Sequence, residues 1–566
     1  MAPDPADILR WEAPGPGAWA LDRSHVNRPA TPINQHVQSI GTARGMRRVF
    51  AELGAPVEAL DFRFVNGLVY SRVRPLIRPD NPGATLPPLP LLRLAVRLHP
   101  AMRQRRRTAE RMFDERPWRA VVAEWHAPGG RRERLEATNL ALQDVPLAEL
   151  DDAALVAHAL RTVEHAVEQF DLHMWLHGYD LGPIGMLLFS AQRWGITPAE
   201  VVPLLEGASP STSSAERTLR RIREAVDAVG VTPATLEQLR GVSPEVDADV
   251  SAFLRLRGRL VFSRYDIDGL TLAEAPEVVL ATILAARDDA GRAAAAAEAL
   301  AVRTASVRSR VPAAERDDFD RALTEARAAM DLRDDNGPNT VEWPLGLIRL
   351  ALLELGRRMV AGGLAEQAEH ALELAPGELP GALDLRRSPG AAELAGRQRW
   401  RRTVDVDGAP RVLGGPEPAP PLTVLPDALA RIAGMIQMVI AEAGLDGEVR
   451  SSGLRGFGVG STTYRGTARL ADSPEAALSI LEPGDVLVVP CTTPAFNLVL
   501  SLAGAVVTAE GGSLSHAAVL ARELGIPAVV GVPRALHDIP DGATVEVDPV
   551  AGEVRVVPAA AGAVPQ

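Results

Sequence analysis

Residues 508–531 read Thr-Ala-Glu-Gly-Gly-Ser-Leu-Ser-His-Ala-Ala-Val-Leu-Ala-Arg-Glu-Leu-Gly-Ile-Pro-Ala-Val-Val-Gly, and they decide the fold of the C-terminal part of the chain. Ala505–Ala509 is a short apolar run typical of a strand, and Gly511-Gly512 interrupts it. Ser515–Leu524 has the composition and apolar spacing of a helix, which the following glycine and proline end. The pattern predicts a strand, a glycine turn, a helix and a second strand, with His516 in the first helical turn.

His516 is the candidate reactive residue of this stretch. A neutral imidazole keeps one nitrogen lone pair for attack on phosphorus, and the N–H groups of a helix start favour a bound dianion. Gly511 and Gly512 have no Cβ, so backbone donors can approach phosphoryl oxygens closely. The plainer alternative is that Ser513 or Ser515 only caps the helix and that His516 is a surface residue.

Composition limits the class of protein. The chain has 566 residues, 46% hydrophobic content, 23% charge and a net charge of −12, which fits a globular protein of several domains and argues against a general nucleic-acid binder. A single cysteine, Cys491, excludes an intrachain disulfide and a multi-cysteine metal site. With neither a bilayer-length apolar stretch nor a signal-peptide pattern at the start, we expect a cytoplasmic protein without membrane or nucleic-acid partners.

The 24 residues of 508–531 resemble the phosphohistidine signature of the PEP-utilising enzymes, such as PEP synthases, pyruvate phosphate dikinases, rifampin phosphotransferases and Enzyme I of the sugar phosphotransfer system. The resemblance extends to residues 450–558 through Pro483–Val488, Thr492-Thr493-Pro494, Asp541-Gly542 and Asp548…Gly552. It implies a β/β/α swivelling domain in which His516 takes phosphate from one active site and delivers it to another. By the same resemblance, the phosphate would be cradled by Gly511, Gly512 and Ser515, with support from Thr508.

The source of the phosphoryl group is a separate question. The sequence contains no lysine, so all 60 basic residues are arginine and no Walker A loop can exist. A GC-rich genome would explain this bias as well as any function does. ATP-grasp domains, which phosphorylate the swivelling histidine in related enzymes, normally use lysines on the nucleotide phosphates, and no segment resembles one. We therefore expect no cofactor within the chain, and ATP with Mg at a donor site on a separate ATP-grasp-type protein.

Four regions organise the chain. Residues 1–150 form a mixed, mainly helical region whose architecture the sequence does not define. Residues 151–402 form a helical region that resembles the acceptor-binding part of rifampin phosphotransferases. Residues 403–449 are a linker and helix, and the six prolines in 403–427 suit either a semi-rigid tether or a surface loop. Residues 450–558 are the swivelling domain. The amphipathic pattern predicts helices at 152–170, 214–228, 272–303, 313–331 and 344–362.

Arg333 is a second candidate site residue. Residues 332–339, Leu-Arg-Asp-Asp-Asn-Gly-Pro-Asn, are similar to a Leu-Arg-Glu-x-Pro-Lys segment whose Arg and Lys face the phosphohistidine in the family. Arg333 matches the family arginine, where a guanidinium would neutralise the transferring phosphoryl group. The family lysine has no counterpart, and Arg349 in the next helix is a candidate substitute. The alternative role for Arg333 is compensation of a helix dipole.

A histidine-rich helix offers a candidate base. At 100° per residue, one broad face carries His165, Glu168 or Gln169, His173, His177 and Asp180. His173 is a candidate general base for an acceptor hydroxyl; helix packing is the plainer alternative, and we expect no metal because no carboxylate completes the pair His173 and His177.

The sequence thus predicts a multidomain protein with a mostly α-helical N-terminal and central body and a C-terminal β/β/α swivelling phosphohistidine domain. Its expected activity is phosphotransfer of the dikinase type from His516 to a hydroxyl of a small molecule, incomplete without the donor protein. Two alternatives stay open: a phosphocarrier that relays phosphate between proteins, and a non-catalytic ligand-binding protein on the same fold.

Overall fold

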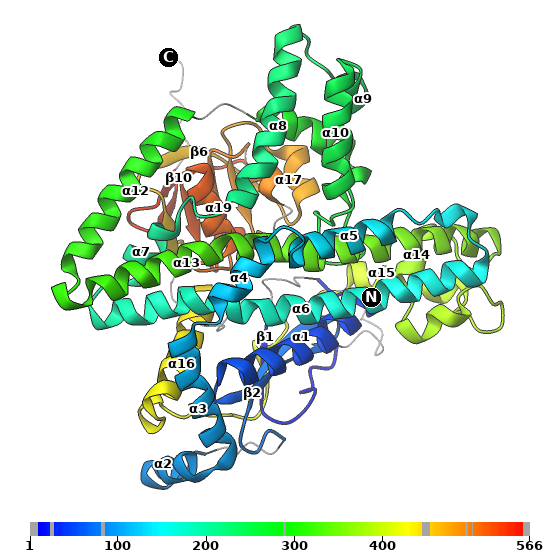
Figure 1. The fold of residues 1–566 in the computed structure, drawn as a ribbon. Helices are drawn as coiled ribbons and strands as arrows, with labels where there is room; N and C mark the ends of the chain where they lie inside the picture. The colour runs from blue at the N-terminus through cyan, green and yellow to red at the C-terminus, as the bar shows by residue number, and fades with distance from the viewer. Residues whose placement is uncertain are drawn as a thin grey trace, which may run out of the picture. The chain divides into compact units, whose positions relative to one another are not determined.

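The computed structural model describes residues 9–22, 28–80, 85–286, 290–443, 453–492, 496–500 and 502–557 (Figure 1). The chain divides into two compact units, and each is described by itself. Unit 1 comprises Met1–Gly182, Asp266–Asp268 and Asn339–Ile436, and unit 2 comprises Pro183–Tyr265, Gly269–Pro338 and Gln437–Gln566. The chain is mostly helical and ends in a sheet domain, in agreement with the sequence pattern.

Unit 1 contains an antiparallel sheet that the sequence pattern did not define. Its strands are β1 (Ala18–Leu21), β2 (Val57–Val65), β3 (Leu68–Pro75) and β4 (Val412–Gly414), in the order β2-β3-β1-β4. Strand β4 lies within the proline-rich segment, and Glu417 just beyond it forms an ion pair of 2.7 Å with the buried Arg72 on β3. Residues 412–417 are therefore held on unit 1, and the tether interpretation does not apply to them.

The two longest helices that begin in unit 1 are α1 (Pro32–Leu53) and α6 (Asp152–Arg193); α6 extends beyond the predicted 152–170 and continues into unit 2 from Pro183. Gly41 and Gly45 on α1 allow close approach, because a Cβ on Gly41 would lie 2.7 Å from the Cβ of Phe170, and one on Gly45 would lie 2.7 Å from that of Met174. The other helical segments are α2 (Leu89–Leu98), α3 (Pro100–Glu115), α4 (Trp118–His126), α5 (Arg131–Gln143), η2 (Leu147–Glu149), α14 (Trp343–Ala361), η7 (Ala368–Glu373), η8 (Pro376–Gly381), α15 (Ala391–Thr403), η9 (Leu422–Val424) and the first part of α16 (Asp427–Ala443).

The predicted single helix at 272–303 is wrong. Thr271 and Glu274 form a capping box around the short η4 (Leu272–Glu274), and a new helix begins at Pro276, where the ring fits the first turn but cannot continue a helix. The helical part of unit 2 has the elements α7 (Pro198–Val201), η3 (Val202–Leu205), α8 (Pro210–Val229), α9 (Leu236–Arg240), α10 (Pro244–Arg257), α11 (Pro276–Ala285), α12 (Ala290–Arg310), η5 (Ala313–Glu315) and α13 (Arg316–Gly337), after which the π-helical η6 (Pro338–Glu342) follows.

The C-terminal domain in unit 2 is a seven-stranded sheet of order β11-β10-β6-β7-β8-β9-β5. Strands β6, β7, β8 and β9 are parallel, and the remaining pairs are antiparallel. The elements run β5 (Phe457–Val459), β6 (Tyr464–Leu470), α17 (Pro474–Ile480), β7 (Val486–Val489), α18 (Asn497–Leu500), β8 (Ala505–Thr508), α19 (His516–Leu524), β9 (Ala528–Val530), α20 (Ala535–Asp538), β10 (Thr544–Asp548) and β11 (Glu553–Val556). The predicted strand, helix and strand of 508–531 are confirmed.

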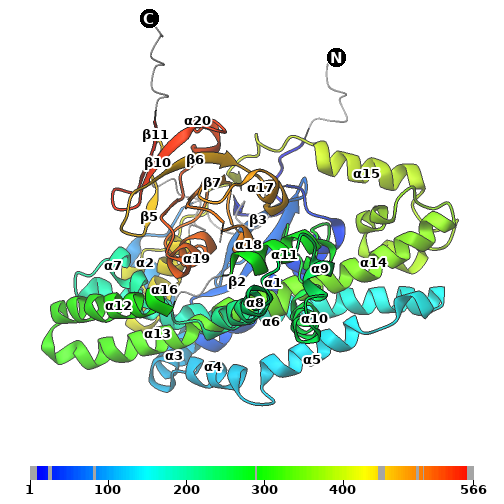
Figure 2. The same ribbon diagram turned by 90° about the horizontal axis from the view of Figure 1, so that it is seen from above.

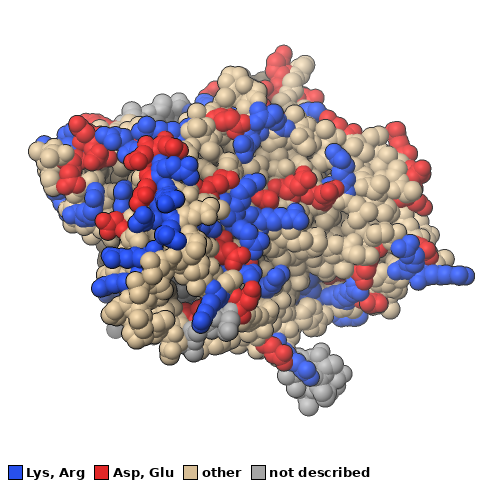
Figure 3. All heavy atoms as spheres, turned by 60° about the horizontal axis from the view of Figure 1, so that its bottom comes forward, with Lys and Arg blue, Asp and Glu red and all other residues tan. Residues whose placement is uncertain are grey.

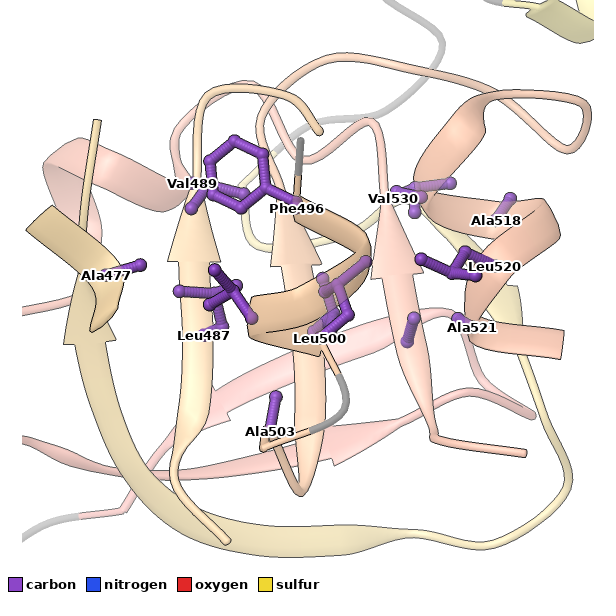
Figure 4. Close-up of a cluster of buried hydrophobic side chains, with 14 of the residues drawn as sticks. Ala477, Leu487, Val489, Phe496, Leu500, Ala503, Ala518, Leu520, Ala521 and Val530 are labelled. Atoms are coloured by element: carbon purple, nitrogen blue, oxygen red, sulfur yellow. The ribbon is translucent and has the colours of Figure 1, made fainter. Parts of the chain in front are cut away.

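The core of this domain has two layers because the side chains of a strand alternate between the two faces of a sheet. On β7, Leu487 and Val489 pack with residues of α17, α18 and α19, as Figure 4 shows. Val486 and Val488 point to the other face, where they pack with residues of α20, β10 and β11. Figure 2 shows α17, α18 and α19 on one side of the parallel strands. Helix α19 thereby packs on this face, and its first residue, His516, follows the carboxyl end of β8.

Two further observations concern the apolar content of the helices and the charges on one face of the protein. Among the described residues, no helix combines the length and apolar content that crossing a bilayer requires. The face drawn in Figure 3 intersperses acidic and basic side chains with uncharged ones.

Candidate functional site

His516 is the first residue of α19 and follows the carboxyl end of the parallel strand β8. The hydroxyl of Thr492, which follows the neighbouring parallel strand β7, lies 2.9 Å from His516 Nδ1. Carboxyl ends of parallel strands meet at one edge of a sheet, which is where ligands bind in such folds. His516 is partly buried, so the residue keeps some exposure at this edge. Thr493 and Pro494 of the same segment lie outside the described residues.

The turn before His516 needs glycine. Gly511 has φ +113°, and a Cβ there would lie 2.9 Å from the Cβ and Oγ of Ser515. The hydroxyl of the buried Thr508 donates to Glu510 O at 2.7 Å and so stabilises the turn. Gly512 O accepts from Ser515 N–H at 3.0 Å. Four of the predicted site residues, Thr508, Gly511, Gly512 and Ser515, are thus brought together around the start of α19.

Ser515 caps the helix as the plainer sequence interpretation requires. Its hydroxyl accepts from Ala518 N–H, and the helix ends at Gly525 in the left-handed conformation with φ +65°. A cap does not exclude a role toward an anion, because the remaining N–H groups of the first turn have no partner within the helix. The phosphate-cradling role of these residues stays a prediction.

Arg333 on α13 is the cation whose charge lowers the pKa of His516. Its Nη2 donates to Leu514 O, two residues before His516, at 2.6 Å, and its Nη1 lies 3.5 Å from Asp334. Helix α13 continues to Gly337 and then into η6, so Arg333 is not in the last turn, where a dipole-compensating residue would lie. The family-like arginine and the candidate histidine therefore share one site in unit 2.

The environment keeps the His516 imidazole neutral. Burial and then the charge of Arg333 lower the pKa of His516 to about 3. At neutral pH the ring is therefore an uncharged nucleophile. Because Nδ1 is engaged by Thr492, Nε2 is the nitrogen available to a phosphoryl group.

Sequence reasoning missed two residues of this site. Thr492 belonged to the quoted motif, but its contact with His516 depends on the pairing of β7 with β8. Arg522 on α19 lies in the same motif and donates to Ser513 O at 2.7 Å. Burial lowers the pKa of Arg522 to about 10, and the carboxylate of Glu206 opposes that shift. An arginine two turns into the helix was the available signal, since its side chain can fold back over the helix start.

His173 lies in unit 1, at the centre of a chain of polar side chains. Its Nδ1 lies 3.1 Å from Thr340 Oγ1, and its Nε2 lies 3.1 Å from His177 Nε2. His177 Nδ1 lies 3.2 Å from the fully buried Asp180. If the ionised Asp180 accepts from His177, each ring has one N–H, and Thr340 donates to His173. Both ring nitrogens of His173 are then engaged, and its role as a general base stays a prediction.

The other candidates on unit 1 have structural partners. Arg349 on α14 is buried and donates to Ile267 O at 3.1 Å. His165 Nε2 lies 2.7 Å from Asn139 Oδ1, and burial, followed by the charge of Arg161, lowers the pKa of His165 to about 4. His173 and Arg349 belong to unit 1, whereas His516 and Arg333 belong to unit 2, so their participation in one site stays a prediction. Across the described part of the chain, no three His, Cys, Asp or Glu residues are grouped as metal ligands would be.

Comparison with known proteins identifies the C-terminal domain. Residues 481–552 match the model of the PEP-utilising enzyme, mobile domain. The match covers β7 to β10 and includes the turn, His516 and α19. The chain therefore carries the mobile domain of the PEP-utilising enzymes, as its sequence resemblance indicated.

Individual relatives extend the similarity over the helical part. Chondramide synthase of Chondromyces crocatus is 32% identical over 329 residues, which are 55% of this chain and 8% of that protein. An uncharacterised protein of Mycobacterium bovis is 27% identical over 443 residues, 75% of this chain and 44% of that protein. The phosphoenolpyruvate synthase of Aeropyrum pernix is 42% identical over 113 residues, 20% of this chain and 13% of that protein. In each case the chain spans less than half of the relative.

Proposed function

We propose that this chain is a phosphotransferase of the dikinase type that carries phosphate on His516. The observation that supports it best is a neutral imidazole at a helix start beside Arg333, in a domain shared with PEP-utilising enzymes. In the first step, the Nε2 lone pair attacks phosphorus, a P–N bond forms, and the bond to the donor's leaving group breaks. Nδ1–H donates to Thr492 throughout, so the ring needs no additional proton.

The second step delivers the phosphoryl group to a small molecule. An acceptor hydroxyl attacks phosphorus, the P–N bond breaks, and its electron pair returns to Nε2. Arg333 stabilises the charge on the transferring group, which is the largest contribution available to phosphoryl transfer. The hydroxyl proton goes to a base, for which His173, oriented by His177 and Asp180, is the proposed residue. Arg349 is the proposed replacement for the family lysine.

The donor is proposed to be a separate ATP-grasp-type protein that holds ATP and Mg. This proposal is supported by a sequence without lysine, the residue with which such domains usually bind nucleotide phosphates. A requirement for a second protein is directly measurable.

The test uses phosphoramidate, a small phosphoryl donor that needs no nucleotide site. The full chain is treated with it, and its intact mass is measured under alkaline conditions, where phosphohistidine survives. We expect a gain of one phosphate that is acid-labile and absent from His516→Ala. His537→Ala is the matched control, because His537 is an exposed histidine of α20 in the same domain. Labelling of both variants to the wild-type level would overturn the proposal.

The labelled chain then separates the remaining alternatives. Release of phosphate to a panel of small hydroxyl compounds supports the phosphotransferase, whereas release to a protein alone supports a phosphocarrier. A chain that binds ligand equally well with and without His516, and takes no label, is a binding protein.

A further inference from the structure

Ser513 and Leu514, in the loop that leads to His516, are held from outside the C-terminal sheet by two helices. Glu442 on α16 accepts a hydrogen bond from the Ser513 hydroxyl with its carboxylate, and its main-chain oxygen accepts from Leu514 N–H at 2.9 Å. Arg333 on α13 donates to Leu514 O at 2.6 Å. Both polar groups of the Leu514 main chain are therefore bonded to residues of other elements.

The two loop residues in these contacts are buried. Ser513 is 1% exposed and Leu514 is 2% exposed. Moving the loop away from α13 and α16 would break the three hydrogen bonds and hydrate both residues. Buried polar groups that lose their partners are costly, particularly where one partner is charged. The loop is thus held in a single position in this structure.

The Glu442 carboxylate also offsets part of the positive charge around Arg522. Arg522 donates to Ser513 O at 2.7 Å, and the charges that act on its guanidinium are the carboxylates of Glu206 and Glu442 and the arginines Arg333 and Arg303. The Ser513 side chain and its carbonyl therefore bond to opposite charges, a carboxylate and a guanidinium. Without Glu442, the buried Ser513 hydroxyl would lose its acceptor, and Arg522 would lose a nearby negative charge.

We propose that Glu442 is a positioning residue: it latches the phosphohistidine loop so that His516 faces Arg333. This inference rests on the proposed function, because a carrier histidine must stop at each of its sites in turn. Glu442 lies near the end of α16, the last helix that the structure describes before β5, so the latch couples that helix to the loop. Release of this contact frees the domain to present His516 elsewhere.

The pH profile of His516 labelling reports whether the loop is latched. In the latched position, burial and the charge of Arg333 lower the pKa of the His516 ring, and Thr492 is its hydrogen-bond partner. When the loop is released, the ring becomes hydrated and its pKa returns toward about 6.5, so it is largely protonated at pH 5.5. A protonated ring is not a nucleophile.

The experiment compares phosphoramidate labelling rates at pH 5.5 and pH 8 for wild type and variants of the full chain. For each protein, the rate at pH 5.5 is divided by the rate at pH 8. Dividing this ratio by the wild-type ratio removes the pH dependence of the reactivity of phosphoramidate itself. For Glu442→Ala we expect the normalised ratio to fall about tenfold, by the pKa argument above. Ser513→Ala should give the same fall, and the double variant no further one, since both remove one interaction.

Two variants serve as controls. Glu442→Gln keeps an acceptor oxygen for Ser513 and should restore a ratio within about twofold of wild type, the rescue expected of a positioning role. Glu546→Ala removes a carboxylate of β10 that pairs with Arg555 at 3.1 Å, in the same domain, and should leave the ratio unchanged. Thermal melting of each variant checks folding, and Ser513→Ala serves if Glu442→Ala is unstable.

The outcomes separate this inference from the proposed function. Wild-type chain that takes no label at His516 overturns both. Wild-type labelling with an unchanged ratio in Glu442→Ala and Ser513→Ala overturns the latch and leaves the proposed function standing. A fall in Glu442→Gln as large as in Glu442→Ala also contradicts a positioning role.

Discussion

At the scale of single residues, His516 differs from an ordinary surface histidine in its charge state. Burial and Arg333 keep it neutral, and Thr492 occupies one ring nitrogen. A neutral ring with one free lone pair is the form that attacks phosphorus. The pair formed by His516 and Arg333 therefore supplies both a nucleophile and a cation for the dianion that results.

The first prediction concerns pH. Because the pKa of His516 is lowered to about 3, the neutral form persists below the ordinary value of about 6.5. Labelling by phosphoramidate, divided by that of free imidazole at the same pH, should therefore rise as pH falls from 8 to 5, since only the free imidazole becomes protonated. A constant quotient would show that His516 titrates like the model compound.

The second prediction concerns Arg333. Arg333→Gln removes the charge that stabilises the transferring group, and transfer from phosphohistidine to an acceptor should slow on the order of a hundredfold. Arg333→Lys, which keeps the charge, should recover part of the rate. The rate of phosphohistidine loss in single turnover is the measurement, and a Gln variant as fast as wild type would contradict this role.

The sequence predicted some of these residues and missed others for physical reasons. His516 and Arg333 were identifiable because local motifs carry them. The contact between Thr492 and His516 depends on which strand lies beside β8, and Glu442 depends on where α16 lies. Neither relationship is encoded in a local pattern.

At the scale of elements, the strand, turn and helix from β8 to α19 position the histidine. The turn requires glycine at 511 because of its positive φ, and the helix requires its cap at Ser515. These are local constraints, which explains why the sequence predicted this part closely. The failed prediction at 272–303 arose because a capping box and Pro276 separate η4 from α11, and because α11 ends at Ala285, where Ala286 is extended.

The third prediction separates the two roles of Ser515. Ser515→Ala removes the N-cap and should lower the free energy of unfolding by about 1 kcal/mol. Ser515→Asp keeps a capping oxygen but adds a negative charge, so stability should be retained while labelling of His516 slows. Chemical denaturation and alkaline mass measurement check the two effects. Equal labelling of wild type and Ser515→Asp would argue against a phosphate near this residue.

Strand β4 shows how a long-range pairing escapes sequence analysis. The proline-rich segment has the composition of a tether, but residues 412–414 pair with β1, almost four hundred residues earlier in the chain. Composition describes a segment's intrinsic stiffness and gives no information about such partners. The helical part of the chain was predicted better, since amphipathic periodicity is local.

At the scale of the whole molecule, the proposal is a helical body with a mobile phosphate carrier. The mobile-domain match is limited to residues 481–552, and similarity to the mycobacterial relative extends over 75% of the chain. In the proposal, His516 of unit 2 donates the phosphoryl group and His173 of unit 1 takes the proton of the acceptor hydroxyl, and this joint role stays a prediction.

The fourth prediction concerns the proposed separate donor protein, which would supply the phosphoryl group to His516. The chain incubated with ATP and Mg alone should gain no phosphate, whereas addition of an ATP-grasp protein from the same cells should give stoichiometric label on wild type and none on His516→Ala. A gain with ATP alone would show that the chain holds its own nucleotide site.

The proposed phosphotransfer depends on formation of a P–N bond by the His516 ring. Alkaline intact-mass measurement followed by peptide mapping, after treatment with phosphoramidate, tests it most directly. We expect one acid-labile phosphate on the peptide that contains residue 516, lost in His516→Ala and kept in His537→Ala. Label located on any other residue, or a wild-type chain that stays unmodified, would contradict it.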